Sequence, residues 1–138
     1  FIPVFFALEP GRDRQITERA ANMVQCPCHV ISAPHDGHLI VGLMGRMRIV
    51  VSMRLHALIF AAGLGIPLVG IVYDPKVSAF LDYLRQDRYV VLDDVTPEVM
   101  RSLNEQACMA ENGEYSAEQL RKLAEENEFA ARRLLEEA

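Results

Sequence analysis

The sequence predicts an α/β fold in which a parallel sheet carries helices on both faces. Apolar runs alternate with amphipathic stretches about five times along the 138 residues. The runs are too apolar for strands that face water on one side, which is typical of a parallel sheet between two helical layers. We expect residues 1–110 to form this domain, with right-handed crossovers between successive strands.

The first elements follow from one long apolar run and the breaks after it. Residues 2–8 are predicted to be a buried strand, which residues 9–12 end because they include Pro and Gly. Asp13 can cap the helix that follows, to about residue 24. Residues 29–32 are predicted to be a short strand. Residues 35–45 are predicted to be a weak helix, because Gly occurs there three times.

The next elements carry clearer signals. Residues 48–52 are predicted to be a strand, and residues 54–64 a helix. The predicted apolar face of that helix comprises Leu55, Leu58, Ile59 and Ala62. Gly63 and Gly65 should end the helix, and Pro67 forbids its continuation.

Two helix starts share one pattern. Asp74-Pro75 and Thr96-Pro97 each place a capping side chain directly before a Pro in the first helical turn. These helices should follow predicted strands at residues 67–73 and 89–92, and the second should run to about residue 110.

The last part of the chain, residues 111–138, is predicted to be an amphipathic helix that docks on the domain or on a partner. Ser116 and Gln119 can form a capping box, and Tyr115 can contact Leu120 as a hydrophobic staple. One apolar stripe comprises Leu120, Leu123, Ala124, Ala131, Leu134 and Leu135. Phe129 falls on the opposite side, where it suggests a second contact.

Composition excludes several classes. Hydrophobic residues make up 51% of the chain and charged residues 24%, so it is not a disordered protein. No apolar run reaches the ~18 residues that a membrane span needs. Residues 1–110 hold 11 acidic and 10 basic side chains without a basic stripe, so we expect no nucleic-acid partner. The start resembles no signal peptide and lacks Met, so we expect a cytoplasmic fragment of a longer protein.

Ligands of parallel sheets bind beyond the carboxyl ends of the strands, where Arg54 and His56 are expected. Both follow an apolar strand and open a helix, whose N–H groups and dipole favour an anion. An Arg at the positively charged N-terminus of a helix is unfavourable unless a bound anion or a carboxylate compensates its charge. The alternative is that Arg54 pairs with an acidic side chain and that His56 is a hydrogen-bonded core group.

Lys76 lies in a first helical turn, again the unfavourable end for a cation. If the two strands are neighbours, the sheet brings this loop beside the Arg54 loop. The alternative is a solvated Lys76 and an Asp74 that only caps its helix. We favour that alternative for Asp74 and leave both open for Lys76.

A metal site is not expected. The motif Cys26-Pro27-Cys28-His29 lacks the second ligand pair of a structural zinc site. Asp13, His35, Asp36 and Asp74 are candidates for a pocket edge. His35 and Asp36 follow a predicted strand, although a plain polar turn explains them as well. The chain has no P-loop, nucleophile elbow or G-x-G-x-x-G motif.

Two segments at a specific separation resemble the C-terminal half of polysaccharide pyruvyl transferases. They are the Arg-Leu-His-Ala segment at residues 54–57 and the Tyr-Asp-Pro-Lys-Val segment at residues 73–77. The bacterial cell-wall members are the most similar, and the resemblance is strongest over residues 46–80. A weaker similarity reaches back to Asp13, which resembles an aspartate that the family carries after an early strand.

The resemblance implies a GT-B fold of two Rossmann-like domains, of which the N-terminal one lies outside this chain. It implies phosphoenolpyruvate as the donor substrate, a sugar or lipid-linked saccharide as the acceptor, and no cofactor. By position, Arg54, Leu55 and Lys76 correspond to donor-binding residues. His56 is the candidate general acid, because imidazole titrates near neutral pH. The acceptor would bring the enzyme to the inner face of the membrane.

Two other functions remain open at this point. A GT-B glycosyltransferase that binds a nucleotide sugar would also use a helix N-terminus for phosphates. A non-catalytic α/β module that acts through its acidic C-terminal helix would instead pair Arg54 and His56 internally. Without its covering domain the chain should expose apolar surface, which favours a homodimer.

Overall fold

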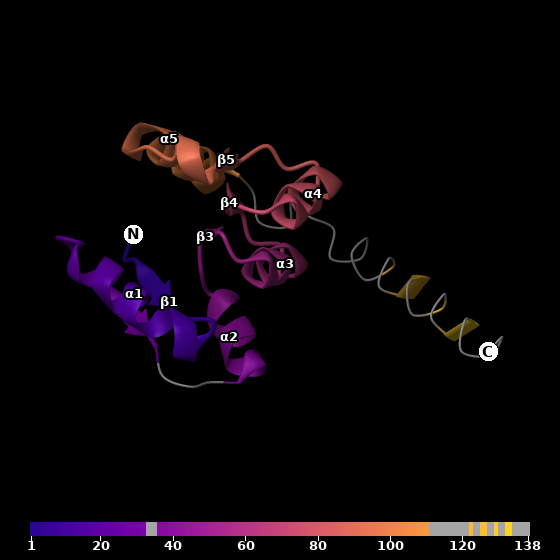
Figure 1. Ribbon diagram of the computed structural model, residues 1–138, viewed down its shortest axis with the longest axis horizontal. Helices are drawn as coiled ribbons and strands as arrows, with labels where there is room; N and C mark the ends of the chain where they lie inside the picture. Colours follow the sequence, from indigo (N-terminus) through magenta and orange to yellow (C-terminus); the bar gives the residue numbers. More distant parts are fainter. Residues whose placement is uncertain (33–35, 111–121, 123–124, 127–128, 130–131, 134–138) are drawn as a thin grey trace. The chain divides into compact units, whose positions relative to one another are not determined.

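The computed structural model describes residues 1–32, 36–110, 122, 125–126, 129 and 132–133. Among these residues, strands and helices alternate along the chain, and every strand pairing is parallel (Figure 1). The predicted α/β class with a Rossmann-like alternation is therefore confirmed. The chain divides into two compact units, Phe1–Ile40 and Val41–Ala138.

In the first unit, β1 (Val4–Phe6) pairs in parallel with β2 (His29–Ile31). The crossover between them is α1 (Pro10–Asn22), which contacts both strands and buries Thr17 and Ala21. The short α2 (Gly37–Met44) is the next element of the chain, and the boundary between the two units falls within it.

The predicted start of α1 is wrong. The helix begins at Pro10, with Glu9 as its N-cap residue, and Asp13 lies in the first turn. Its Oδ2 atom accepts a hydrogen bond from the Glu9 backbone N–H at 3.1 Å. Pro-Gly suggested a break, but Pro fits the first helical position because that N–H has no partner inside a helix.

In the second unit, three parallel strands lie in the order β3-β4-β5. They are β3 (Val50–Ser52), β4 (Leu68–Val72) and β5 (Tyr89–Val91). The central strand β4 is buried at four of its five residues. This agrees with its wholly apolar sequence, since a central strand between two helical layers meets no water.

Helices cover both faces of this sheet. Side chains of adjacent strand residues point to opposite faces. Gly70 of β4 faces Leu81 of α4 (Pro75–Tyr83). Val69 belongs instead to a buried cluster that includes Leu103 and Ala107 of α5 (Pro97–Met109). In Figure 1, α5 lies on one side of the strands, and α3 and α4 lie on the other.

The buried face of α3 (Leu55–Gly63) differs from the predicted one. The helix buries Ala57, Leu58, Ala61 and Ala62, whereas Ile59 is 36% exposed. Three alanines on the buried face let the helix backbone approach β3 and β4 closely, so packing selects the small side chains over the larger Ile59.

After β5 the chain forms a short 3-10 helix, η1 (Leu92–Asp94), and then α5. The C-terminus of α5 is tied to the start of β3. Arg48 Nη2 donates to the carbonyl oxygens of Cys108 at 2.6 Å and Ala110 at 3.4 Å.

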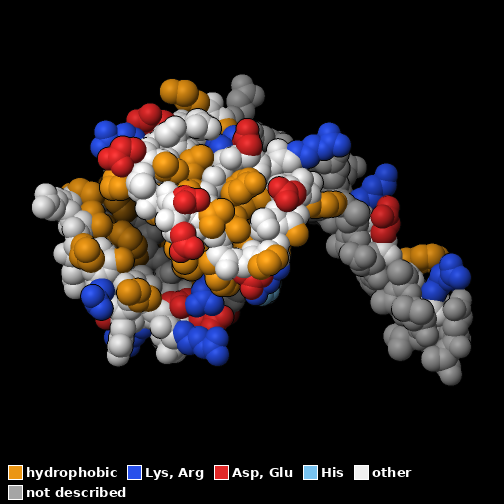
Figure 2. All heavy atoms as spheres, turned by 45° about the horizontal axis from the view of Figure 1, so that its top comes forward, with side chains coloured by type: hydrophobic (Ala, Val, Ile, Leu, Met, Phe, Trp, Pro, Cys, Tyr) orange, Lys and Arg blue, Asp and Glu red, His pale blue; other side chains and the backbone are white. Residues whose placement is uncertain are grey.

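The capping box, the staple and the apolar stripe predicted for residues 111–138 lie outside the described residues. Phe129 is described and is 67% exposed. Figure 2 shows hydrophobic side chains among charged ones on the surface that it draws. Within the described ranges, no helix is long and apolar enough to span a bilayer. That residues 1–110 form one domain stays a prediction.

Candidate functional site

The candidate site lies at the carboxyl edge of β3 and β4. These strands are parallel neighbours, and Ser52 aligns with Gly70. The loops that leave them therefore emerge at the same edge of the sheet. This meets the condition under which the Lys76 loop was expected to lie beside the Arg54 loop. The helices that begin at these loops, α3 and α4, also contact each other.

Arg54 is the N-cap residue of α3. The turn before it is set by Ser52, the last residue of β3, whose Oγ accepts a hydrogen bond from the Arg54 backbone N–H at 2.9 Å. Ser52 was not singled out in the sequence. Its signal is a Ser two residues before the helix start, because Ser hydroxyls often accept a hydrogen bond from the backbone two residues on.

The N-terminus of α3 differs from those of the next two helices. The Arg54 side chain makes no capping hydrogen bond. In contrast, Asp74 accepts from the backbone N–H of Lys76 at 2.9 Å, and Thr96 accepts from that of Val99 at 3.2 Å. An N-cap side chain normally satisfies one of the first helical N–H groups. In α3 the N-cap position instead holds a cation that cannot accept a hydrogen bond, which favours an anion at this helix end.

His56 and Leu55 occupy the first turn of α3. His56 is exposed, so the interpretation that it is a core histidine is wrong. Leu55 is partly buried and brings its backbone to the same helix end. An exposed imidazole beside the positive end of a helix can deliver a proton to a ligand bound there.

Asp74 caps α4, as its sequence predicts. Its Oδ1 accepts the backbone hydrogen bond described above, and its Oδ2 lies 3.4 Å from Nζ of Lys76. The hydrogen bond from the Lys76 backbone N–H is the main cause that holds the pKa of Asp74 below its ordinary value. The Lys76 side chain is 55% exposed. It is therefore both largely solvated and ion-paired.

The remaining candidates belong to the first unit. Asp36 is exposed, and its Oδ1 accepts from the backbone N–H of Leu39 at 2.7 Å, which caps α2. Asp13 lies in the first turn of α1. His35 lies outside the described residues. That these three side chains and Asp74 edge a ligand pocket stays a prediction.

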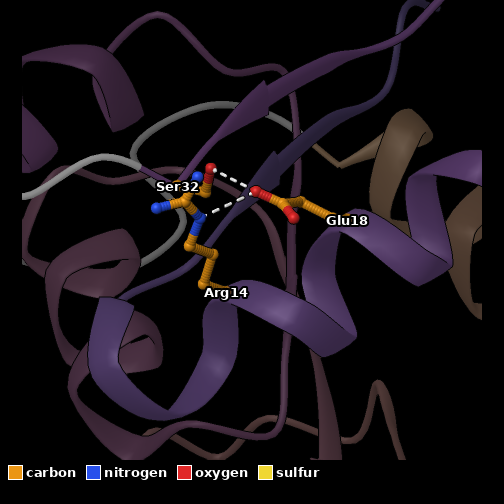
Figure 3. Close-up of polar contacts among 3 residues, drawn as sticks. All are labelled: Arg14, Glu18 and Ser32. Carbon is orange, nitrogen blue, oxygen red and sulfur yellow. Dashed lines mark hydrogen bonds and ion pairs between the residues drawn. The ribbon is translucent and has the colours of Figure 1, made fainter.

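A polar cluster in the same unit joins α1 to the end of β2 (Figure 3). Glu18 Oε1 accepts from Arg14 Nε at 2.9 Å and from Ser32 Oγ at 3.2 Å. These two hydrogen bonds, the one from Arg14 first, lower the pKa of Glu18. The sequence reading did not single out this cluster, because a pair at i and i+4 on an exposed helix is common.

The cysteine motif shows no metal-binding arrangement in the described part of the chain. Cys26 is exposed and Cys28 is partly buried, and both are free thiols. Where the structure describes side chains, no group of three or more His, Cys, Asp or Glu residues could hold a metal ion.

The sequence of the chain matches a protein family. A family model described as polysaccharide pyruvyl transferase matches residues 4–75, slightly more than half of the chain. The chain belongs to the polysaccharide pyruvyl transferase family. The matched range contains Arg54 and His56 and ends directly before Lys76. No curated protein and no solved structure matches the chain significantly.

Membership of this family indicates the general type of reaction. Polysaccharide pyruvyl transferases are transferases, and their chemistry requires a pyruvyl donor and a sugar acceptor. The second unit of the chain has a sheet edge with a cationic N-cap residue, an exposed imidazole and an ion-paired lysine.

Proposed function

We propose that the carboxyl edge of β3 and β4 binds phosphoenolpyruvate, and that the intact enzyme transfers its pyruvyl group to two hydroxyls of a sugar as a ketal. One observation carries the proposal, namely that α3 begins at Arg54 without a side-chain cap, whereas α4 and α5 are capped. A helix start without a capping side-chain acceptor, beside a guanidinium, suits a small anion.

The donor carries a carboxylate and a phosphate, and the residues at the edge match these groups. Arg54 can grip either group with two parallel hydrogen bonds, because its guanidinium is planar and forked. The backbone N–H groups of Leu55 and His56 add donors at the same helix end. Lys76 adds a second positive charge from the neighbouring loop.

Ketal formation has three chemical requirements. A proton must reach the enol double bond, a sugar hydroxyl must add to C2 of the donor, and a second hydroxyl must replace the phosphate at C2. We assign the proton delivery to His56. The cations at the edge stabilise the negative charge that develops on the departing phosphate.

The assignment of His56 is tested by His56→Ala in the intact enzyme, with turnover of phosphoenolpyruvate as the readout. Loss of a general acid should lower kcat by about 10²–10⁴-fold without loss of the fold. His38, an exposed histidine on α2, provides the matched control, and His38→Ala should leave turnover unchanged. Near-normal turnover of the His56 variant would refute the acid role.

The acceptor and the assembly extend the same proposal. We propose a sugar or lipid-linked saccharide acceptor, a GT-B arrangement with an N-terminal domain, and cytoplasmic action near the membrane face that presents the acceptor. Tyr73, Val91 and Leu92 follow or end strands at the same edge, and each is 46% exposed. Apolar surface of this kind suits a covering domain or a second copy.

A further inference from the structure

Asp74, the N-cap residue of α4, contacts Lys76 through both of its carboxylate oxygens. Asp74 Oδ1 accepts from the backbone N–H of Lys76 at 2.9 Å, while Oδ2 lies 3.4 Å from the Nζ atom of that residue. Capping uses only one carboxylate oxygen. The second oxygen could remain in water, yet it is directed to the ammonium group.

This second contact places the Lys76 ammonium. Lys76 lies in the first turn of α4, where the helix dipole disfavours a cation and an unrestrained lysine would extend away into water. The ion pair draws Nζ back to the N-cap residue, and therefore to the loop between β4 and α4. That loop leaves the sheet at the edge where Arg54 begins α3 on the neighbouring strand.

The pair leaves the lysine able to bind a ligand. The Lys76 side chain is 55% exposed and the Asp74 side chain 35%. The ammonium has three N–H donors, of which one faces Asp74. The other donors can reach an anionic oxygen of a bound molecule without breaking the pair.

We propose that Asp74 is a positioning residue, which holds the ammonium of Lys76 at the sheet edge so that it meets an anionic oxygen of the donor. This inference rests on the proposed function, since it takes phosphoenolpyruvate as the ligand. Asp74 itself does not touch the donor in this scheme. An exposed ion pair of this type changes an equilibrium by about two- to fivefold, which sets the size of the expected effect.

The test is Asp74→Asn in the intact enzyme. Asn caps helices as well as Asp and keeps an oxygen for the Lys76 backbone N–H, so α4 should remain intact while the charge of the ion pair is lost. The KM for phosphoenolpyruvate should rise about two- to fivefold, and kcat should change less. The matched control is Thr96→Ala, which removes a cap from α5 and should leave this KM unchanged.

A second measurement separates positioning from a structural effect. In a Lys76→Met background, Asp74→Asn should produce no further rise in KM, because the carboxylate acts through the lysine. An equal rise in both backgrounds would overturn the inference. So would an unchanged or lower KM in the single variant, since a lower KM means that Asp74 competes with the donor. A parent enzyme that phosphoenolpyruvate does not saturate would instead refute the proposed function.

Discussion

Gly70 offers the sharpest test of the packing that supports the site. It lies in the middle of β4, opposite Ser52 on β3 and Tyr89 on β5. A Cβ atom added there would lie 2.5 Å from Cδ1 and 3.4 Å from Cδ2 of Leu81, and 3.3 Å from Cβ of Tyr89. Leu81 is fully buried, so Gly70→Ala must displace the leucine or shift α4 away from the sheet.

The size of the effect follows from this geometry. Extra methyl groups in a well-packed core destabilise a protein by about 1–3 kcal/mol. For a chain of this length, that loss corresponds to a fall in Tm of roughly 3–15 °C. Leu81→Ala alone should destabilise by about 2–5 kcal/mol through the cavity that it leaves. In the double variant the new methyl fills part of that cavity, so the two losses should not add.

The assay is urea unfolding of the four proteins of this cycle, followed by circular dichroism. Gly63, the last residue of α3, provides a matched control, because a Cβ there meets nothing within 4 Å. Gly63→Ala should be neutral or stabilise by about 0.4–1 kcal/mol. A Gly70→Ala protein as stable as its parent, or a double variant with strictly additive losses, would refute the close approach of α4 to β4.

Three further predictions concern the site and the helix ends. Arg54→Lys should raise the KM for phosphoenolpyruvate at least tenfold. Lysine cannot form the paired hydrogen bonds of a guanidinium, and a hydrogen bond to a charged group contributes about 1.5–3 kcal/mol. An unchanged KM in steady-state kinetics would contradict the assignment. Thr96→Ala should lower the free energy of unfolding by about 1 kcal/mol, whereas Thr96→Ser should retain most of it, as urea titration can measure. The pKa of Glu18 is lowered from 4.5, so its bonds to Arg14 and Ser32 stabilise the fold above that pH and are lost as pH falls through the lowered pKa. Glu18→Gln should therefore make Tm depend less on pH below about 5, and an unaltered pH dependence would show that the cluster does not contribute.

Local signals predicted the elements well where one residue type decides the outcome. Asp74-Pro75 and Thr96-Pro97 begin helices as expected, because the capping oxygen and the fixed φ of Pro act within a single turn. The start of α1 was misplaced, since Pro10-Gly11 fits both a break and a first turn.

Features that depend on tertiary packing were harder to predict. The sequence of α3 allows two apolar stripes, and only contact with β3 and β4 selects the alanine-rich one. The sequence analysis assumed that β3 and β4 are neighbours and could not predict it. Val50 and Leu68 are 18 positions apart, and they become partners only when the crossover helix folds back.

The site itself was predicted in part. Arg54 was found because a cation at a helix start is unusual, and both Arg54 and His56 were found because they resemble a family segment. Ser52 was missed, although its hydroxyl shapes the turn before Arg54. The double contact of Asp74 with Lys76 was not predicted either, since Asp-Pro explains a helix start without any role for the second oxygen.

The most direct test of the central claim is calorimetric titration of the intact enzyme with phosphoenolpyruvate, beside a parallel titration with a UDP-sugar. The account predicts saturable binding of phosphoenolpyruvate that Arg54→Lys weakens and His38→Ala leaves unchanged. Saturation by the UDP-sugar alone, or phosphoenolpyruvate binding that is indifferent to Arg54, would contradict it.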